Sequence, residues 1–311
     1  MVASVFIDGA AGTTGLDIAE RLSARSDVSI VALDEARRKD SAARAEALRD
    51  SDFAILCLPD DAAREAAALA QGSRVRLIDA STAHRTAAGW AYGFAELAPG
   101  QRATIAGAAR ISNPGCYPTG FLALVAPLVQ RSLIPAGALL TCHAVSGYSG
   151  GGKALIARFE KEERDIAWRG YALGLDHKHV PEMRRHAGLA HPPIFAPAVV
   201  PAYRGMVVEV PLHRSNTAIA PADELKAAWI EHFVQSPLVS VGGLGTDGEL
   251  LLRSNPAPDD RLVIDLFASA DGQQIRMVAM LDNLGKGAGG ACVHNLNLMA
   301  GLEETAGLRL A

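Results

Sequence analysis

The sequence predicts an α/β fold of two domains, and three observations support this prediction. Apolar runs typical of strands alternate with helical segments over residues 5–79, which favours a mostly parallel sheet covered on both faces. A glycine-rich turn over residues 9–15 directly follows the first of these runs. After Ser112 the pattern changes to β-rich segments joined by proline-rich links. The length of 311 residues is also that of about two domains.

The first domain is expected to begin strand, turn, helix, strand. Its strands are predicted at residues 5–7, 28–33, 53–58 and 75–79. Its helices are predicted at residues 16–26, 34–49 and 62–70. A strand–turn–helix–strand unit of this length suits a parallel crossover, which favours a doubly wound sheet.

The second domain is expected to hold an antiparallel or mixed sheet with helices on one side. A helix is predicted over residues 119–133. The strands are predicted at residues 139–145, 194–200, 206–212, 262–268 and 275–281. The last segment, residues 285–306, reads as a glycine-rich turn followed by a helix.

Composition excludes several classes of protein. The net charge of −4 leaves no basic excess for a general nucleic-acid binder. With 49% hydrophobic and 21% charged residues, the chain can fill a large core and is not disordered. Its apolar runs fall well short of the roughly 20 residues that span a bilayer, and the N-terminus lacks the basic region of an export signal. Four scattered cysteines predict reduced thiols and a cytoplasmic protein.

The glycine turn has the position of a dinucleotide-binding turn, between the first strand and the first helix. Glycines in the pattern Gly9-x-x-Gly12-x-x-Gly15 allow a tight turn and leave amides at the helix start facing a pyrophosphate. Asp34, at the end of the second strand, suits the ribose hydroxyl of NAD. The cluster Arg37-Arg38-Lys39 suits the 2′-phosphate of NADP, or is a solvated helix face. These residues alone leave the choice of coenzyme open.

The stretch from Asn113 to Thr119 singles out one thiol. Pro-Gly forces a turn immediately before Cys116 and an apolar helix follows it, so the thiol should lie at a helix N-terminus. The helix dipole and unpaired amides favour a thiolate there and can receive an oxyanion. Cys57 and Cys142, inside strand segments, and Cys292 are expected to be structural.

A base for this thiol is expected in residues 176–182, which hold two histidines, a lysine and a carboxylate. His177 and His179 would point the same way in an extended segment, and Glu182 could orient either imidazole. The remaining histidines form no matching ligand cluster, so no metal site is predicted.

Two further loops could bind anions. Residues 146–153 supply glycine amides, two hydroxyls and Lys153 after a predicted strand, although a flexible linker is the alternative. Arg85 follows the strand that ends at Asp79, where open α/β sheets bind ligands. It could contact a phosphate or carboxylate, or be a lone surface arginine.

Together these motifs resemble the N-acetyl-γ-glutamyl-phosphate reductase family, in its shorter type 2 form. The resemblance covers essentially the whole chain and is carried by residues 9–15, 112–119, 146–153, 177–182 and 282–290. It implies a Rossmann-like NADP-binding domain over residues 1–115, to which a C-terminal helix over 286–311 returns. It implies a catalytic and oligomerisation domain of the semialdehyde-dehydrogenase type over residues 116–285.

The resemblance also implies an activity and a set of partners. The family reduces an acyl phosphate with NADPH in arginine biosynthesis, releases inorganic phosphate, and forms homo-oligomers, here a dimer or tetramer. No nucleic acid, membrane or metal partner is expected. Cys116 is expected to form a thioester with the acyl group, because a serine ester would accept hydride less well. His179, or alternatively His177, is expected to move the proton.

The motifs and the family that they resemble together give a set of expected site residues. The expected catalytic residues are Cys116, His179, His177 and Glu182. The expected cofactor residues are Gly9, Gly12, Thr13, Thr14, Gly15, Arg37, Arg38, Ser81, Asn283, Lys286 and Gly287. The expected substrate and phosphate residues are Arg85, Asn113, Ser146, Gly147, Ser149, Gly150 and Lys153.

Two departures from the family and three rival functions accompany this interpretation. His294 stands where the family often has Gln, and the segment before Phe53 leaves little room for the third strand of longer relatives. The nearest rival is an aspartate-semialdehyde dehydrogenase, which would need carboxylates for a free α-amino group. The others are a cysteine hydrolase or amidotransferase without a cofactor, and an NADP-sensing regulator without chemistry.

Overall fold

The computed structural model describes residues 2–214, 218–245 and 247–310, and the chain divides into two compact units. The first unit contains the chain up to Ala95, Gly100–Gly115 and Ala288–Arg309. The second contains Glu96–Pro99 and Cys116–Gly287. That residues 1–115 bind the cofactor and residues 116–285 perform catalysis stays a prediction.

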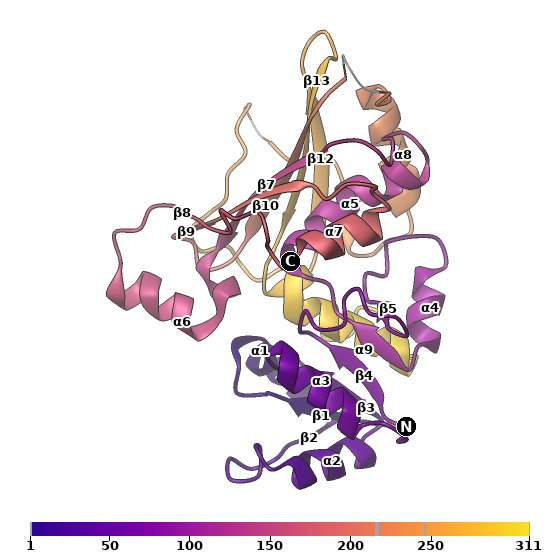
Figure 1. Cartoon of the computed structure of the whole chain (residues 1–311), viewed down its shortest axis with the longest axis vertical. Helices are drawn as coiled ribbons and strands as arrows, with labels where there is room; N and C mark the ends of the chain where they lie inside the picture. The colour runs from indigo at the N-terminus through magenta and orange to yellow at the C-terminus, as the bar shows by residue number, and fades with distance from the viewer. Residues whose placement is uncertain (1, 215–217, 246, 311) are drawn as a thin grey trace. The chain divides into compact units, whose positions relative to one another are not determined.

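The first unit is built on a six-stranded parallel sheet (Figure 1). Its strands are β1 (Ala3–Asp8), β2 (Val28–Val31), β3 (Phe53–Leu56), β4 (Arg76–Asp79), β5 (Ala91–Tyr92) and β6 (Arg110–Ser112). Its helices are α1 (Thr13–Ser23), α2 (Ser41–Asp50), α3 (Asp60–Leu69), α4 (Gln101–Gly107) and α9 (Gly290–Ala300). The order β2-β1-β3-β4-β6-β5 places a switch in strand order beside β1, so the glycine turn lies where such sheets bind ligands.

Both faces of this sheet are covered, as predicted. Alternate residues of β1 point to opposite faces: Val5 and Ile7 pack with α1 and α9, and Phe6 packs with α2. Each face therefore has its own apolar core, and the loops at the ends of the strands carry the polar residues.

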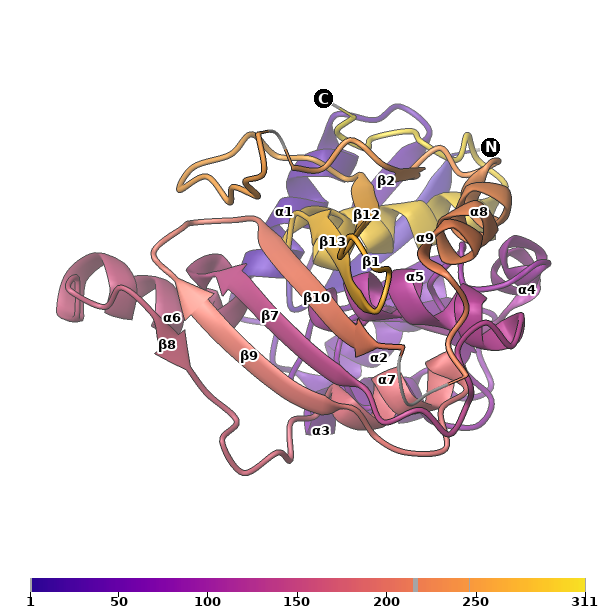
Figure 2. The same ribbon diagram turned by 90° about the horizontal axis from the view of Figure 1, so that it is seen from above.

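The second unit is built on a seven-stranded sheet that is mixed, one of the two predicted forms, and contains two short strands, β8 and β11, beyond the five that were predicted. Its strands are β7 (Thr141–Gly147), β8 (Arg169–Gly170), β9 (Ile194–Val200), β10 (Met206–His213), β11 (Val239–Val241), β12 (Leu262–Ala268) and β13 (Gln274–Leu281). Its helices are α5 (Cys116–Gln130), α6 (Gly152–Ala157), α7 (Val180–Ala187) and α8 (Ala222–Phe233). The order is β11-β12-β13-β10-β7-β9-β8, and Figure 2 shows β9, β7 and β10 side by side.

Helix α5 is the central helix of the second unit and lies against the sheet. It is apolar on all sides, as a fully buried helix must be. Gly120 allows the close approach, because a Cβ at this position would lie 2.8 Å from Val208 Cγ2. The indole Nε1 of Trp229 on α8 donates to Leu124 O at 3.0 Å. These contacts fix α5 against the sheet, and they therefore also fix the position of its first residues.

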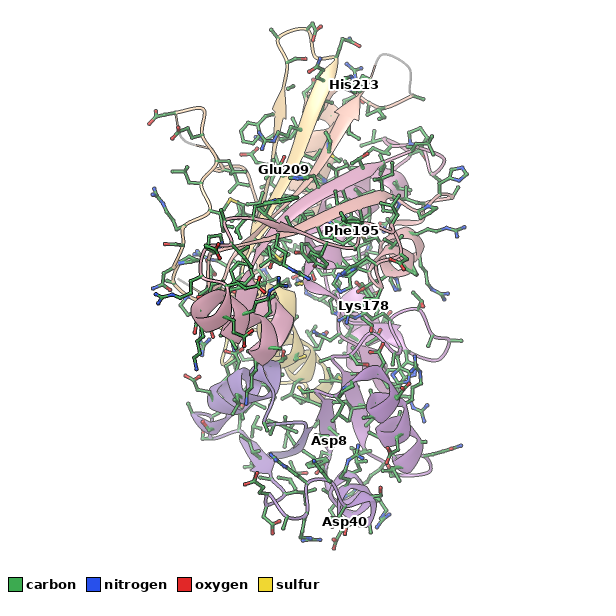
Figure 3. The ribbon with its side chains drawn as sticks, turned by 60° about the vertical axis from the view of Figure 1, so that its left-hand side comes forward. Asp8, Asp40, Lys178, Phe195, Glu209 and His213 are labelled. Atoms are coloured by element: carbon green, nitrogen blue, oxygen red, sulfur yellow. The ribbon has the colours of Figure 1, made fainter. Side chains whose placement is uncertain are left out.

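Several predicted boundaries were wrong. The helix expected over residues 34–49 begins at Ser41, because Asp40 (labelled in Figure 3) caps it by accepting from Ala42 N at 2.7 Å and Ala43 N at 3.1 Å. The C-terminal helix expected over 286–311 covers only Gly290–Ala300, because Gly301 adopts a left-handed conformation with φ +66° and ends it. Within the described ranges, no helix combines the length and apolar character needed to cross a membrane.

Candidate active site

Cys116 is the first residue of α5, as its motif predicts. Asn113, Pro114 and Gly115 precede it without regular structure, and the thiol is partly exposed whereas the rest of the first turn is buried. Pro118 is tolerated in this turn, because the amide that it lacks has no intrahelical partner there. The thiol therefore lies where the helix dipole favours its anion.

His177 and His179 lie side by side, but not in the extended segment that the sequence suggested. Residues 178 and 179 form a turn that leads into α7, and this turn brings the two ring centroids to 4.6 Å. The backbone N–H of His179 donates to His177 Nδ1 at 3.1 Å. A bond accepted at Nδ1 requires the proton of a neutral His177 to be on Nε2, so the turn fixes its tautomer. His179 is 6% exposed, and Glu182, one turn into α7, is 1% exposed.

Aromatic side chains connect the nucleophile's helix to this imidazole pair. The Tyr117 ring centroid lies 6.5 Å from that of His177, 6.0 Å from that of His179 and 5.2 Å from that of Phe195 on β9 (labelled in Figure 3). The Tyr117 hydroxyl donates to Ala198 O at 3.1 Å. The residue after the nucleophile therefore packs both histidines against the sheet.

Two phenols near the thiol stay protonated at neutral pH. Burial raises the pKa of Tyr117 well above its ordinary value, and the hydrogen bond with Tyr171 and the charge of Cys116 act in the same direction. Burial, with a smaller contribution from the charge of Cys116, raises the pKa of Tyr171 to about 12. Both groups therefore stay uncharged beside Cys116, and the Tyr117 proton is already donated to Ala198 O.

The loop over residues 146–153 is bonded to the segment after β13 through Asn283. Ser149, in a 3₁₀ turn after β7, accepts a hydrogen bond from Asn283 Nδ2 at 2.9 Å. A Cβ at Gly150 would lie 3.3 Å from that Nδ2 and 3.6 Å from Ser146 Oγ. Gly147 also needs to lack a side chain, because a Cβ would lie 2.7 Å from Ala202 O. Lys153 is exposed on α6.

The turn after β13 lies directly against the nucleophile. A Cβ at Gly287 would lie 2.8 Å from the Cβ of Cys116, so only glycine fits without displacement. Asp282 shapes this turn by accepting from Leu284 N at 2.9 Å and, through its carbonyl, from Gly287 N at 3.0 Å. Lys286 is buried, and its ammonium binds both carboxylate oxygens of Glu96 at 2.9 Å. That ion pair anchors the turn within the second unit.

The glycine turn of the first unit has the geometry of an anion cradle. Gly9 adopts φ +90°, and a Cβ there would lie 2.3 Å from Cys57 O. A Cβ at Gly15 would lie 2.5 Å from Gly9 O. Gly12 precedes α1 without a side-chain cap, and α1 begins with Thr13 and Thr14. The first amides of α1 therefore have no competing side chain.

Arg37 and Arg38 lie in a turn after β2 and not on a helix face. The Asp34 carboxylate accepts from Arg37 N at 2.8 Å and so shapes this turn. Arg37 pairs with Glu46 at 3.0 Å and Arg38 pairs with Glu35 at 2.9 Å, and both guanidinium groups are largely exposed. Two partly exposed cations are thus presented by a turn that Asp34 shapes.

The loop after β4 is tied to buried polar groups. Asp79 is fully buried and accepts from Ser81 Oγ at 2.8 Å, while His84 Nδ1 lies 2.6 Å from its carboxylate. Arg85 is not a surface arginine: it is 8% exposed, and its Nε donates to Asn113 O at 3.0 Å. Arg85 therefore supports the backbone just before the Pro-Gly turn.

The other three thiols lie in apolar surroundings, as expected. Burial raises the pKa of Cys57 to about 12 and raises the pKa values of Cys142 and Cys292 strongly. These thiols stay protonated and unreactive at neutral pH. Across the part of the chain that the structure describes, no group of three or more His, Cys, Asp or Glu side chains could hold a metal ion.

Sequence reasoning missed several residues of the site. Tyr117 and Tyr171 were given no role, although Tyr117 stands next to Cys116 in the motif. Glu96, the partner of Lys286, lies 190 positions away along the chain, so no local pattern could reveal it. His294 donates from Nε2 to the Glu304 carboxylate at 2.8 Å, which gives this departure from the family pattern a partner in the C-terminal turn.

Comparisons with known proteins agree with this geometry. Residues 4–105 match the semialdehyde dehydrogenase NAD-binding domain family, and residues 116–283 match the semialdehyde dehydrogenase dimerisation domain family. The chain is 47% identical to an N-acetyl-gamma-glutamyl-phosphate reductase of Trichormus variabilis, with 98% of each chain covered. It is 45% identical to one of Sinorhizobium fredii, with 96% of this chain and 99% of that one covered.

Solved structures show the same fold at low identity. Aspartate semialdehyde dehydrogenase II of Vibrio cholerae superposes with a TM-score of 0.70 at 15% identity, covering 96% of this chain and 98% of the other. The enzyme of Candida albicans, solved with NADP, superposes with a TM-score of 0.65 at 13% identity, covering 97% of this chain and 100% of the other.

Proposed function

Since this chain belongs to the N-acetyl-γ-glutamyl-phosphate reductase family, we propose that it reduces N-acetyl-γ-glutamyl phosphate to N-acetylglutamate semialdehyde with NADPH, in arginine biosynthesis. The observation that carries the proposal is the partly exposed thiol of Cys116 at the start of α5. Tyr117 links this thiol's helix to the His177–His179 pair. A thiol at a helix N-terminus beside imidazoles is suited to covalent catalysis.

The covalent steps follow from the positions of these residues. The Cys116 thiolate attacks the acyl carbon, and the bond to phosphate breaks with both electrons leaving on the phosphate oxygen. A bound nicotinamide coenzyme would supply the hydride that reduces the resulting thioester. His179 donates a proton to the hemithioacetal oxygen as it forms and takes that proton back when the intermediate collapses. The carbon–sulfur bond then breaks and releases the aldehyde and the thiolate. His179 is assigned this role because the His177 Nδ1 atom already accepts a backbone hydrogen bond.

Polar groups of each unit, taken separately, suit a part of a nicotinamide dinucleotide. The amides that follow Gly9, Gly12 and Gly15 suit its pyrophosphate. In the second unit, Asn283 is 2% exposed, and no described residue donates a hydrogen bond to its Oδ1 atom. A buried acceptor of this kind suits an N–H donor such as the nicotinamide carboxamide. Replacing Asn283 with Ala should therefore weaken NADPH binding, measured by coenzyme fluorescence without substrate. Ser81, Lys286 and Gly287 remain predicted cofactor contacts.

NADP is the coenzyme that the turn after β2 supports. Because Asp34 is engaged with Arg37 N, we assign it to shaping the turn, while Arg37 and Arg38 bind the 2′-phosphate. Replacing Arg37 or Arg38 with Ala should raise the KM for NADPH roughly tenfold and leave the KM for NADH unchanged. Arg64→Ala is the matched control, because Arg64 forms a similar exposed pair with Asp61 on α3. Equal effects on both coenzymes would contradict the assignment.

The phosphate of the substrate is assigned to loop residues. Ser146, Gly147, Ser149, Gly150 and Lys153 of the second unit, with Arg85 and Asn113 of the first, are the predicted contacts. The buried hydroxyl of Ser149 is fixed by Asn283, which gives the loop a defined conformation. Defined donors are what an anion site requires.

The experiment that tests the function is the reverse reaction, phosphate-dependent reduction of NADP. N-acetylglutamate semialdehyde should support turnover, and aspartate semialdehyde should not. A preference for aspartate semialdehyde would identify the activity as that of an aspartate-semialdehyde dehydrogenase. Turnover of neither aldehyde, with no quenching of NADPH fluorescence, would favour a cysteine hydrolase.

We also propose that the protein is a homo-oligomer in the cytoplasm. The match of residues 116–283 to a dimerisation domain supports self-association through the second unit. The four cysteines, none of which forms a disulfide, suit a reducing compartment. Light scattering on the purified protein should give the mass of a dimer or tetramer, and a monomer at micromolar concentration would contradict this.

A further inference from the structure

A chain of three hydrogen bonds in the first unit runs from Gly93 O to Ala288 O and passes through Asn113, the first residue of the Asn-Pro-Gly-Cys motif. Asn295, on α9, donates from Nδ2 to Gly93 O at 2.9 Å and to Asn113 Oδ1 at 2.9 Å. Asn113 donates from its own Nδ2 to Ala288 O at 3.2 Å. Asn113 is 1% exposed and Asn295 is fully buried.

The two carbonyls at the ends fix the direction of every bond in this chain. A backbone carbonyl only accepts hydrogen bonds, so the side of Asn295 that faces Gly93 O must be its amide nitrogen. That same nitrogen faces Asn113, which must therefore present Oδ1 to it. The Asn113 nitrogen then faces Ala288 O, and one of its two N–H groups is left to donate elsewhere.

The backbone of Asn113 is already held on both sides. Its N–H donates to Asp79 O at 2.7 Å, and its carbonyl accepts from Arg85 Nε at 3.0 Å. The remaining freedom is the rotation of the side-chain amide, whose two ends differ in charge but hardly in shape. Ala288 O, which accepts from Asn113 Nδ2 at 3.2 Å, and Asn295, which donates to Asn113 Oδ1 over the shorter distance of 2.9 Å, remove this freedom together.

We propose that Asn295 is a positioning residue that holds Asn113 with its N–H toward the substrate phosphate, an inference that rests on the proposed function. An anion binds to a donor and is repelled by a carbonyl oxygen, so the orientation of this amide decides whether Asn113 attracts or repels the phosphate. Asn295 acts through Asn113 and touches no reacting atom.

This arrangement leaves one buried polar atom of the first unit without a hydrogen bond. No group in the described ranges donates a hydrogen bond to Asn295 Oδ1, which is buried. An unpaired buried acceptor costs free energy, so an asparagine kept here for stability alone would be a poor choice. Gly93 belongs to the same arrangement, because a Cβ there would lie 2.4 Å from Asn295 Nδ2.

Asn297 provides a matched control on the same helix. It is equally buried, but its Nδ2 donates to Glu304 O and Ala306 O, and its Oδ1 accepts from Arg25 at 2.7 Å. Its amide nitrogen thus binds the C-terminal segment and its oxygen binds Arg25, and neither contacts Asn113. Replacing Asn297 with Ala should lower the melting temperature more than replacing Asn295 with Ala, because it removes more hydrogen bonds and relieves no unpaired acceptor.

The test measures the KM for inorganic phosphate in the reverse reaction, together with the melting temperature. Asn295→Ala should raise this KM roughly tenfold, as expected for one charge-assisted hydrogen bond, and Asn297→Ala should leave it unchanged. Asn295→Asp should raise it further, because the new carboxylate attracts the Asn113 nitrogen and turns its oxygen toward the phosphate. In an Asn113→Ala background, Asn295→Ala should add nothing.

The contrary results are as clear. If Asn295→Ala and Asn297→Ala change the phosphate KM equally, or if the Asn113 and Asn295 effects multiply, Asn295 has only a structural role. If Asn295→Asp does not fold, the comparison of the two alanine variants still decides. Turnover by the wild-type protein is measured first, so a failure of the proposed function is seen there and not confused with a failure of this inference.

Discussion

The first unit and the second unit each present the N-terminus of a helix, but the residues around the two helix starts differ. At α1 the glycines of a single local turn keep side chains away, so that backbone amides are exposed to a ligand. At α5 the helix starts with a thiol, and its neighbours come from distant segments: the loop after β7, the turn before α7 and the turn after β13. A binding turn can be encoded locally, whereas a reactive side chain needs surroundings that only the tertiary fold supplies.

The largest effect is expected at the second helix. Replacing Cys116 with Ala should lower reductase activity on the order of 10⁴-fold or more, because no other thiol can form the thioester. NADPH binding should remain, since the glycine turn is untouched, and fluorescence titration measures it. Cys142→Ala, in the core of the same unit, is the control and should keep most of the activity. Full turnover by the Cys116 variant would exclude the covalent route.

The imidazole pair should show the next largest effect. Replacing His179 with Asn should lower the turnover number by roughly 10²–10⁴-fold and remove one limb of its pH profile, because the proton carrier is lost. His177→Asn should have a smaller effect, because its amide oxygen can still accept the backbone hydrogen bond from His179. A larger loss for His177 would reverse the two roles.

At the first helix, Gly9→Ala should act on coenzyme binding and not on the thiol. The new Cβ would lie 2.3 Å from Cys57 O, and the alanine would have to adopt the left-handed backbone conformation of Gly9. The turn must therefore shift. We expect the dissociation constant for NADPH to rise by about tenfold or more. Gly72→Ala is the control: it has φ +80° with nothing within 4 Å, so it should cost only the backbone strain of about 1–2 kcal/mol. Unchanged coenzyme binding in Gly9→Ala would place the cofactor elsewhere.

The smallest effect concerns acid stability of the first unit. The hydrogen bond with His294, followed by that with Arg102, lowers the pKa of Glu304 to about 2 from its ordinary 4.5. Because the pKa is depressed in the folded protein, this stabilisation is complete above about pH 4.5 and is lost as the pH falls toward 2. Glu304→Gln should flatten the fall in unfolding free energy over this window by about 1 kcal/mol, since the carboxylate is partly exposed. An unchanged pH dependence in urea unfolding would contradict this.

The same contrast explains what the sequence could predict. The glycine turn, the strands β9 and β12 and the helix start at Cys116 follow from short-range patterns of glycine, proline and apolar residues, and all were predicted. The Asp40 cap shortened α2, and the turn before α7 replaced an extended segment, because single side-chain hydrogen bonds decide such ends. The Lys286–Glu96 pair and the Asn295–Asn113 bond join residues more than 180 positions apart, and no local pattern contains them.

The central claim is that Cys116 carries the acyl group. The most direct measurement is peptide mass spectrometry of the wild-type protein mixed with N-acetyl-γ-glutamyl phosphate in the absence of NADPH and quenched in acid. We predict one acyl adduct, on Cys116, which disappears when NADPH is added before the quench. An adduct on another cysteine, or no adduct at any time in a preparation that turns over, would contradict the account.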